Sequence, residues 1–128
     1  DVPGSSAWML GGWVAYAQRQ KTEGLGLEPG FIERFGHVSP EVSMALALAA
    51  RQRAGADWAV GITGWAGPDA LQPGEDPGLV HLAVVGPAGR ELAWSSVWRG
   101  LSRTRLKERA ATDALRGLRL ALLGQGQP

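Results

Sequence analysis

The chain has 128 residues, 45% of them hydrophobic and 20% charged, which fits a folded domain and excludes an intrinsically disordered protein. Thirteen basic and twelve acidic residues give a net charge of +1, so the composition points neither to nucleic acid nor to an anionic membrane as a partner. The lack of cysteine excludes disulfides and a thiol nucleophile within these residues, and the presence of only two histidines argues against a metal site.

The first half of the chain predicts one strand followed by helices. Residues 7–17 are apolar and aromatic with a pair of glycines inside, which predicts a strand that contains a bulge. Residues 18–27 predict a short helix ended by glycine, and residues 31–36 predict a single helical turn. Residues 39–54 predict a longer helix, because serine, proline and glutamate occupy its start and a glycine follows it.

The second half predicts a β-hairpin and a long helix. Residues 57–63 predict a buried strand, and residues 79–86 and 91–98 predict two strands joined by a hairpin turn. Residues 102–123 predict a helix with one apolar face. The order β-α-α-β-β-β-α predicts an α/β fold in which helices cover a mixed sheet.

Small residues form the loop that follows the strand over 57–63. The candidate ligand-binding residues of this loop are Thr63, Gly64, Ala66, Gly67 and Pro68. In open α/β sheets ligands bind beyond the carboxyl ends of strands, and small residues let backbone N–H groups approach an anion closely. A tight turn that merely packs explains the same composition, and composition alone favours the turn.

Lys21 and Tyr16 lie five positions apart where the first strand meets the first helix. If both side chains face one cleft, a desolvated lysine can lose its proton and activate a hydroxyl, which makes a base without histidine. Spacing alone favours a plainer interpretation, a solvated lysine beside a core tyrosine. His37 and His81 have no recognisable Ser or Asp partner in the sequence, and we interpret both as structural.

The C-terminal helix region is basic. Residues 99–119 hold seven basic and two acidic residues, an excess of five positive charges. One or two of them could hold a phosphate at the helix start. A solvated helical face accounts for most of them, and nucleic-acid contact is the weakest hypothesis because aromatic residues are not interleaved with the basic ones.

Several motifs occur in an order that matches one family. Residues 16–27 are similar to a Tyr-x-x-x-x-Lys…Leu-Gly-Val motif, residues 36–42 to Gly-Ala-Val-Ser-x-x-Val, and residues 56–68 to Ala-Asp…Thr-Gly-x-Ala-Gly-Pro. In this combination, over nearly the whole chain, the sequence resembles the CinA C-terminal domain. That family includes competence- and damage-inducible proteins and is also known as the PncC-type nicotinamide mononucleotide amidohydrolase family.

The resemblance implies a three-layer α/β/α fold with a mixed, mostly parallel sheet that contains a C-terminal antiparallel hairpin, in one domain over residues 1–128. It implies hydrolysis of the carboxamide of nicotinamide mononucleotide to the nicotinate nucleotide and ammonia, a step of NAD recycling, with no metal or organic cofactor. Lys21 would be the base of a Ser–Lys mechanism, with Tyr16 beside it. The loop over 63–68 would hold the substrate, and Arg103 would bind its phosphate.

The resemblance also implies a cytoplasmic homodimer whose partner is a small-molecule nucleotide. A membrane is not expected, because no apolar run approaches the roughly 18 residues of a membrane-spanning helix. Nucleic acid is not an expected partner either.

The sequence departs from the family pattern at three places. The nucleophile motif Glu-Ser-Cys-Thr-Gly-Gly does not occur in residues 1–128; we expect it, with a helix and a strand, upstream of Asp1, and we expect these residues alone to be inactive. After Pro68 the family has two glycines and Lys-Pro-Val-Gly, whereas residues 69–71 read Asp-Ala-Leu and residues 76–78 read Asp-Pro-Gly. Leu-Ser precedes Arg103 in place of Gly-Asp. These departures favour an alternative, a catalytically degenerate domain that binds a nucleotide or a protein partner.

Overall fold

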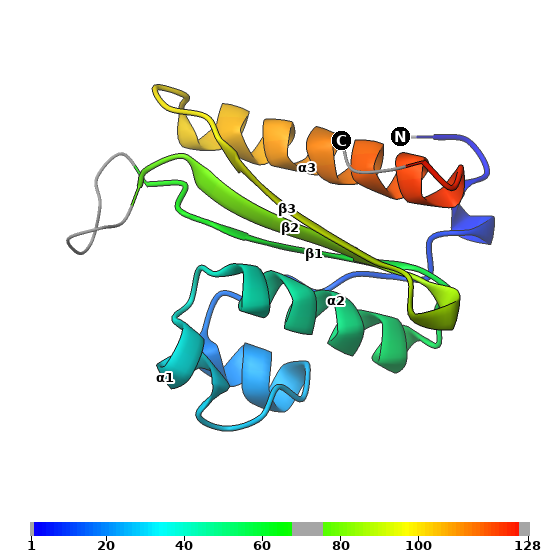
Figure 1. The fold of residues 1–128 in the computed structure, drawn as a ribbon, viewed down its shortest axis with the longest axis horizontal. Helices are drawn as coiled ribbons and strands as arrows, with labels where there is room; N and C mark the ends of the chain where they lie inside the picture. Colours follow the sequence, from blue (N-terminus) through cyan, green and yellow to red (C-terminus); the bar gives the residue numbers. More distant parts are fainter. Residues whose placement is uncertain (1, 68–75, 126–128) are drawn as a thin grey trace.

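The computed structural model describes residues 2–67 and 76–125 (Figure 1). The helices and strands are α1 (Phe31–Phe35), α2 (Pro40–Ala54), β1 (Ala59–Gly64), β2 (Leu79–Val85), β3 (Glu91–Val97) and α3 (Arg103–Leu122). Three short turns of other helix types are η1 (Ser5–Ala7), η2 (Gln20–Gly24) and η3 (Pro87–Gly89). The predictions for residues 31–36, 39–54, 57–63, 79–86, 91–98 and 102–123 are confirmed to within two residues.

The sheet lies between two helical layers. α2 covers one face and α3 covers the other, and α1 and η2 lie on the outer side of α2 (Figure 1). The predicted α/β fold class and its three-layer α/β/α arrangement are therefore confirmed.

The strand directions differ from the expected mostly parallel sheet. The strand order is β1-β2-β3, and both neighbouring pairs are antiparallel. Parallel neighbours need a long crossover, which is usually a helix. β2 and β3 are joined by the short turn η3, and no helix of the described residues lies between β1 and β2. The described sheet therefore contains the predicted hairpin but no parallel pair.

The predicted strand over residues 7–17 is wrong. The turn η1 is followed by extended chain, and within the described structure residues 10–16 make no backbone hydrogen bond. A strand is defined by its hydrogen-bonded partner, which a local apolar pattern cannot supply. The apolar side chains of this segment are consequently exposed, with Trp8 at 87% and Val14 at 82%.

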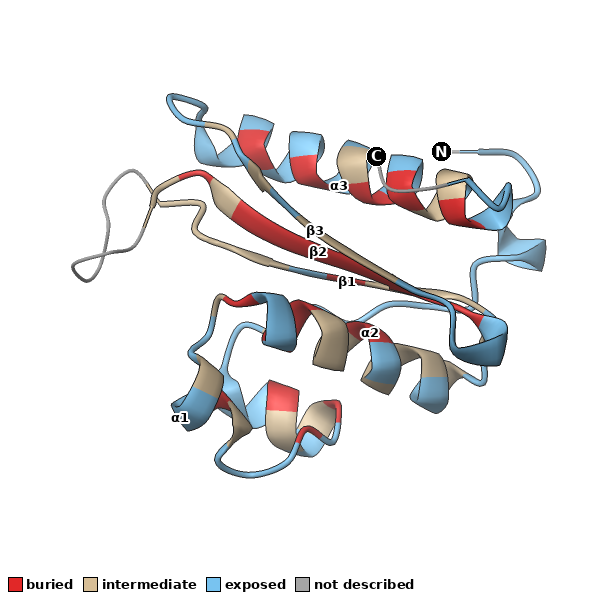
Figure 2. Ribbon diagram, in the orientation of Figure 1, coloured by how far each residue is buried: buried red, intermediate tan, exposed pale blue. Residues whose placement is uncertain are grey.

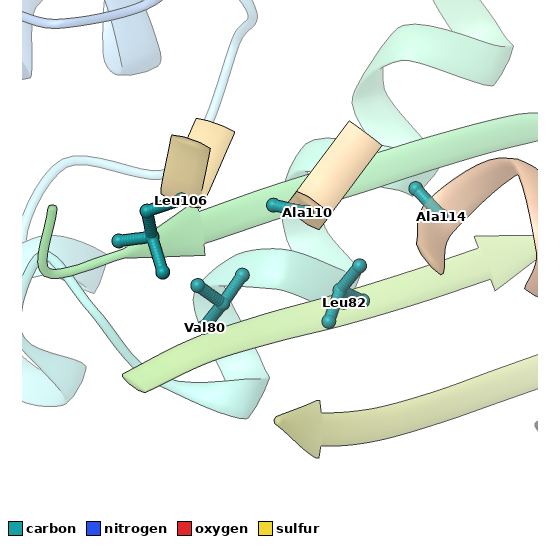
Figure 3. Close-up of a cluster of buried hydrophobic side chains, with 5 residues drawn as sticks. All are labelled: Val80, Leu82, Leu106, Ala110 and Ala114. Carbon is teal, nitrogen blue, oxygen red and sulfur yellow. The ribbon is translucent and has the colours of Figure 1, made fainter. Parts of the chain in front are cut away.

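β2 is the centre of the core because it is covered on both faces (Figure 2). Val80 and Leu82 point toward α3, where Leu106, Ala110 and Ala114 meet them (Figure 3). The alternate side chains of β2 face α2, which follows from the period of two in a strand. α3 is apolar on the face that meets the sheet, and none of the described helices is long and apolar enough to cross a membrane.

α2 is held closely against β1. Its start is capped by Ser39, whose Oγ accepts a hydrogen bond from the Val42 N–H at 3.2 Å, and Gly55 ends it with φ 61°. A Cβ built on Gly61 of β1 would lie 2.7 Å from the backbone nitrogen of Ala47 in α2. The glycine therefore permits the close approach of α2 and β1, the two elements on which the site described next depends.

Candidate functional site

Lys21 is a buried amine on a π-helical turn. Residues Leu25 and Leu27, which follow it, pack with Ile32 and Val42 in a core cluster on α2, and this anchors η2. Lys21 is only 6% exposed as a result. Burial penalises the charged ammonium and lowers the pKa of Lys21 below its ordinary value of 10.5.

Among the described residues, no carboxylate forms an ion pair with Lys21. The ion pairs found among the described residues are Arg19–Glu23 and Arg99–Asp76, and neither involves Lys21. The contact of its Nζ is instead with Nδ1 of His37, at 3.5 Å. A buried ammonium without a counter-ion is costly, so Lys21 gives up its proton more easily than a solvated lysine does.

Thr63 completes a cluster of three residues. Its Oγ1, at the carboxyl end of β1, donates a hydrogen bond to the backbone carbonyl of His37 at 2.8 Å. The structure thus brings two predicted site residues, Lys21 and Thr63, to the same residue, His37. We call Lys21, His37 and Thr63 the lysine cluster.

Polar side chains continue from Thr63 across the sheet. Thr63, His81 and Ser95 are register partners on β1, β2 and β3, so they share the face that α2 covers. His81 is 8% exposed, and its Nδ1 lies 2.7 Å from the Ser95 hydroxyl oxygen. Burial lowers the pKa of His81, and the Glu41 carboxylate at the start of α2 opposes that shift. The sequence predicts a structural role for both histidines; the strand register places His81 beside Thr63, and the Thr63 hydrogen bond places His37 there.

The loop after β1 begins as an extension of the sheet. The Trp65 N–H donates to the Leu79 carbonyl at 2.9 Å, so that donor is not free for a ligand. A Cβ at Gly64 would lie 2.8 Å from the same carbonyl oxygen, which explains this glycine by packing. Ala66 packs against the core under α3. Gly67 is the last residue described before the gap, and Pro68 lies outside the described residues.

Tyr16 meets the other lysine of the chain. Its hydroxyl accepts a hydrogen bond from Nζ of Lys107 on α3 at 2.7 Å, and that amine lies 5.5 Å from the centre of the ring. Hydrogen bonds from Lys107 and Arg103 lower the pKa of Tyr16 below its ordinary value of 10.0. The structure therefore places Tyr16 with Arg103 and Lys107, which we call the phenol cluster, and gives it no hydrogen bond to Lys21.

A groove separates β3 from the basic face of α3. It has a volume of about 660 Å³ and is lined by Trp94, Ser95, Ser96, Trp98, Arg109, Thr112, Asp113 and Arg116. Asp113 accepts hydrogen bonds from the Trp94 indole at 2.9 Å and from the Ser96 hydroxyl at 3.0 Å, so its carboxylate joins α3 to β3 within the fold. Two of the arginines that made the helix basic in sequence line this groove.

Known sequences and solved structures are similar to this chain. The sequence pattern of the CinA C-terminal domain matches residues 1–122. CinA-like proteins of Anaeromyxobacter dehalogenans (strain 2CP-C) and Mycolicibacterium vanbaalenii are 48% and 45% identical over 95% and 96% of this chain. The chain spans 29% of the length of each.

Solved structures show the same fold. The competence/damage inducible protein CihA from Agrobacterium tumefaciens matches with a TM-score of 0.87 and 32% identity, over 97% of this chain and 74% of that one. A competence or damage-inducible protein from Enterobacter asburiae matches with a TM-score of 0.76 and 29% identity, over 84% and 67% of the two chains. Sequence and fold agree over nearly the whole length, and the chain belongs to the CinA C-terminal domain family.

Proposed function

We propose that this domain hydrolyses the carboxamide of nicotinamide mononucleotide to the nicotinate nucleotide and ammonia, with Lys21 as the base. The observation that carries the proposal is the burial of the Lys21 amine, which is 6% exposed and has no carboxylate partner among the described residues. Such an amine loses its proton more easily than a solvated lysine, and the neutral form is a base. Membership of the CinA C-terminal domain family supports the choice of substrate.

The proposed reaction uses Lys21 twice. The neutral amine takes the proton of a serine hydroxyl, and the serine oxygen attacks the carboxamide carbon. The Lys21 ammonium then gives that proton to the amide nitrogen. The C–N bond breaks, ammonia departs, and an acyl-serine remains. Water, deprotonated by the same amine, cleaves this ester, and the serine oxygen recovers the proton. Lys21 makes no hydrogen bond to a serine within residues 2–67 and 76–125, so the nucleophile in this proposal is the serine that the family pattern implies.

The phenol cluster suits the other end of the substrate. Arg103 and Lys107 bring two positive charges to the Tyr16 hydroxyl, at the beginning of α3. A phosphate monoester carries up to two negative charges and accepts several hydrogen bonds, which arginine and lysine side chains can donate. We therefore assign the phosphate to the phenol cluster and the carboxamide to the lysine cluster.

A second candidate is nucleotide binding without catalysis. The phenol cluster needs no nucleophile in order to bind a phosphate, so its presence favours a binding domain as much as it favours an enzyme. The two candidates make different predictions for Lys21, because only the enzyme needs its amine.

Ammonia release from nicotinamide mononucleotide by the full-length protein separates the two candidates. Lys21→Arg keeps the positive charge but cannot supply a neutral base, so we expect kcat to fall by at least about 100-fold while the substrate still binds. The matched control is Lys107→Arg, the same substitution at the other lysine, which should change KM rather than kcat.

The outcomes are distinct. Ammonia release that survives Lys21→Arg contradicts the assignment of the base. Binding of the nucleotide with no ammonia release, weakened by Arg103→Ala and unaffected by Lys21→Arg, would replace the enzyme with the binding domain. No binding and no turnover would refute both candidates.

A further inference from the structure

His37 is the residue that contacts the Lys21 amine. Nδ1 of its ring lies 3.5 Å from Nζ, and Lys21 is buried whereas His37 is exposed. A neutral imidazole with its hydrogen on Nε2 presents Nδ1 as an acceptor, and an ammonium group can only donate. The contact therefore has one direction of hydrogen bonding while Lys21 is charged.

The backbone on both sides of His37 is fixed. Gly36 ends α1 with φ 77°, and its N–H donates to the Ile32 carbonyl at 2.7 Å. Ser39 caps α2 two residues later, and the Thr63 hydroxyl holds the His37 carbonyl at 2.8 Å. Three elements, α1, α2 and β1, thus hold the backbone that carries the imidazole.

We propose that His37 is a positioning residue for Lys21, whose Nζ donates an N–H to Nδ1, as the ammonium and as the neutral amine, and is thereby held in one orientation at the end of β1. The inference rests on the proposed function, in which the Lys21 amine must face the reacting carboxamide. A lysine side chain has four rotatable bonds. A hydrogen-bond acceptor at its tip restricts these rotations before the substrate binds, so the reaction does not have to.

The charged groups around Lys21 are otherwise engaged. Arg19 pairs with Glu23 on and beside η2. On α1, Glu33 accepts a hydrogen bond from Gln18 and Arg34 lies over the Phe35 ring. On α2, Arg53 donates to the Glu23 carbonyl, and the Glu41 carboxylate acts on the pKa of His81. Burial is accordingly the cause of the lowered pKa of Lys21. An acceptor at Nδ1 works against burial, because it stabilises the charged form.

Two substitutions of His37 separate positioning from bulk. His37→Asn replaces the ring nitrogen with a side-chain oxygen that can still accept a hydrogen bond. His37→Leu removes the acceptor and substitutes an apolar side chain of comparable size. Lysine ε-carbon resonances in the ¹³C NMR spectrum report the protonation of each lysine, and the Lys21 signal is the one missing from Lys21→Arg. We expect His37→Leu to lower the pKa of Lys21 by about one unit, and His37→Asn to keep it within a few tenths of a unit.

A second readout needs no substitution that could disturb folding. The ¹⁵N shifts of the imidazole identify its tautomer, and the inference requires neutral His37 to carry its hydrogen on Nε2. A hydrogen on Nδ1, or equal pKa changes of Lys21 in His37→Leu and His37→Asn, would overturn the inference. If His37→Leu does not fold, the tautomer decides alone.

Activity gives the last arm. kcat/KM of a base-catalysed reaction rises with pH through the pKa of the base, so a lowered pKa in His37→Leu should move this rise to lower pH, and His37→Asn should restore it. The NMR measurements use no substrate, so they stand even if the protein releases no ammonia. Ammonia release with an unchanged Lys21 pKa in His37→Leu would refute the positioning role and leave the proposed function intact.

Discussion

Gly61→Ala should separate α2 from the sheet. The new Cβ would lie 2.7 Å from the Ala47 backbone nitrogen and would also meet the Ser43 carbonyl oxygen. Both partners are backbone atoms of one helix and cannot swing aside like a side-chain tip. To restore an ordinary contact of 3.4 Å, α2 has to retreat by at least about 0.7 Å at Ala47.

The retreat affects the core and the site together. Ala47 belongs to a buried cluster with Ala83 and Val85 of β2, which loses contact when the helix moves. Overpacking of this kind costs about 1–3 kcal/mol, and the upper end applies because the obstacle is backbone. For a domain of this size, about 3 kcal/mol corresponds to a fall in Tm of roughly 10 °C. The start of α2 also holds His37 near Thr63, so the lysine cluster should be disturbed as well.

Thermal unfolding followed by circular dichroism measures the effect. The matched control is Gly11→Ala, since a Cβ at Gly11 meets nothing within 4 Å, and we expect a change of no more than about 0.5 kcal/mol. An unchanged Tm in Gly61→Ala would show that α2 does not pack closely against β1 at Gly61. An equal loss in both variants would show that the cost comes from replacing glycine in general.

Two further predictions concern titration. Tyr16 should titrate below 10.0, measured by ultraviolet absorbance as the difference from Tyr16→Phe. Lys107→Met should raise the pKa of Tyr16, because the strongest stabiliser of the phenolate is lost. A Tyr16 pKa that is not lowered would show that the phenol cluster does not form in solution. Lys21→Met should be more stable than the natural chain at pH 7, and the difference should shrink toward pH 10.5, because the folded state binds fewer protons than the unfolded state between the lowered pKa of Lys21 and its ordinary value. Denaturant unfolding at a series of pH values measures this, and a difference that does not change with pH would mean that the buried amine carries no charge penalty.

Local signals explain why most of the fold could be predicted. A serine cap and a following glycine mark the bounds of α2, and the hairpin of β2 and β3 follows from two apolar runs around a short turn. The prediction of a strand over residues 7–17 is wrong because a strand needs a hydrogen-bonded partner, and no strand of the described sheet pairs with this segment.

The site was predictable only in part. The sequence predicts Lys21 and Thr63 as site residues, and both lie in the lysine cluster. Tyr16 was expected beside Lys21, but its hydroxyl meets Lys107, which is 91 positions away along the chain. The role of His37 depends on a contact across 16 positions that joins the π-helical turn η2 to the segment between α1 and α2, and no periodic pattern encodes it.

The central claim is that the buried Lys21 amine is the base of an amide hydrolysis. It is tested most directly by measuring two pKa values in one protein, that of Lys21 by NMR and that of the rise of kcat/KM with pH for ammonia release from nicotinamide mononucleotide. We predict that the two values coincide and lie below 10.5, the ordinary value for lysine. A Lys21 that titrates at or above 10.5, or a kinetic pKa that does not match it, would contradict the claim.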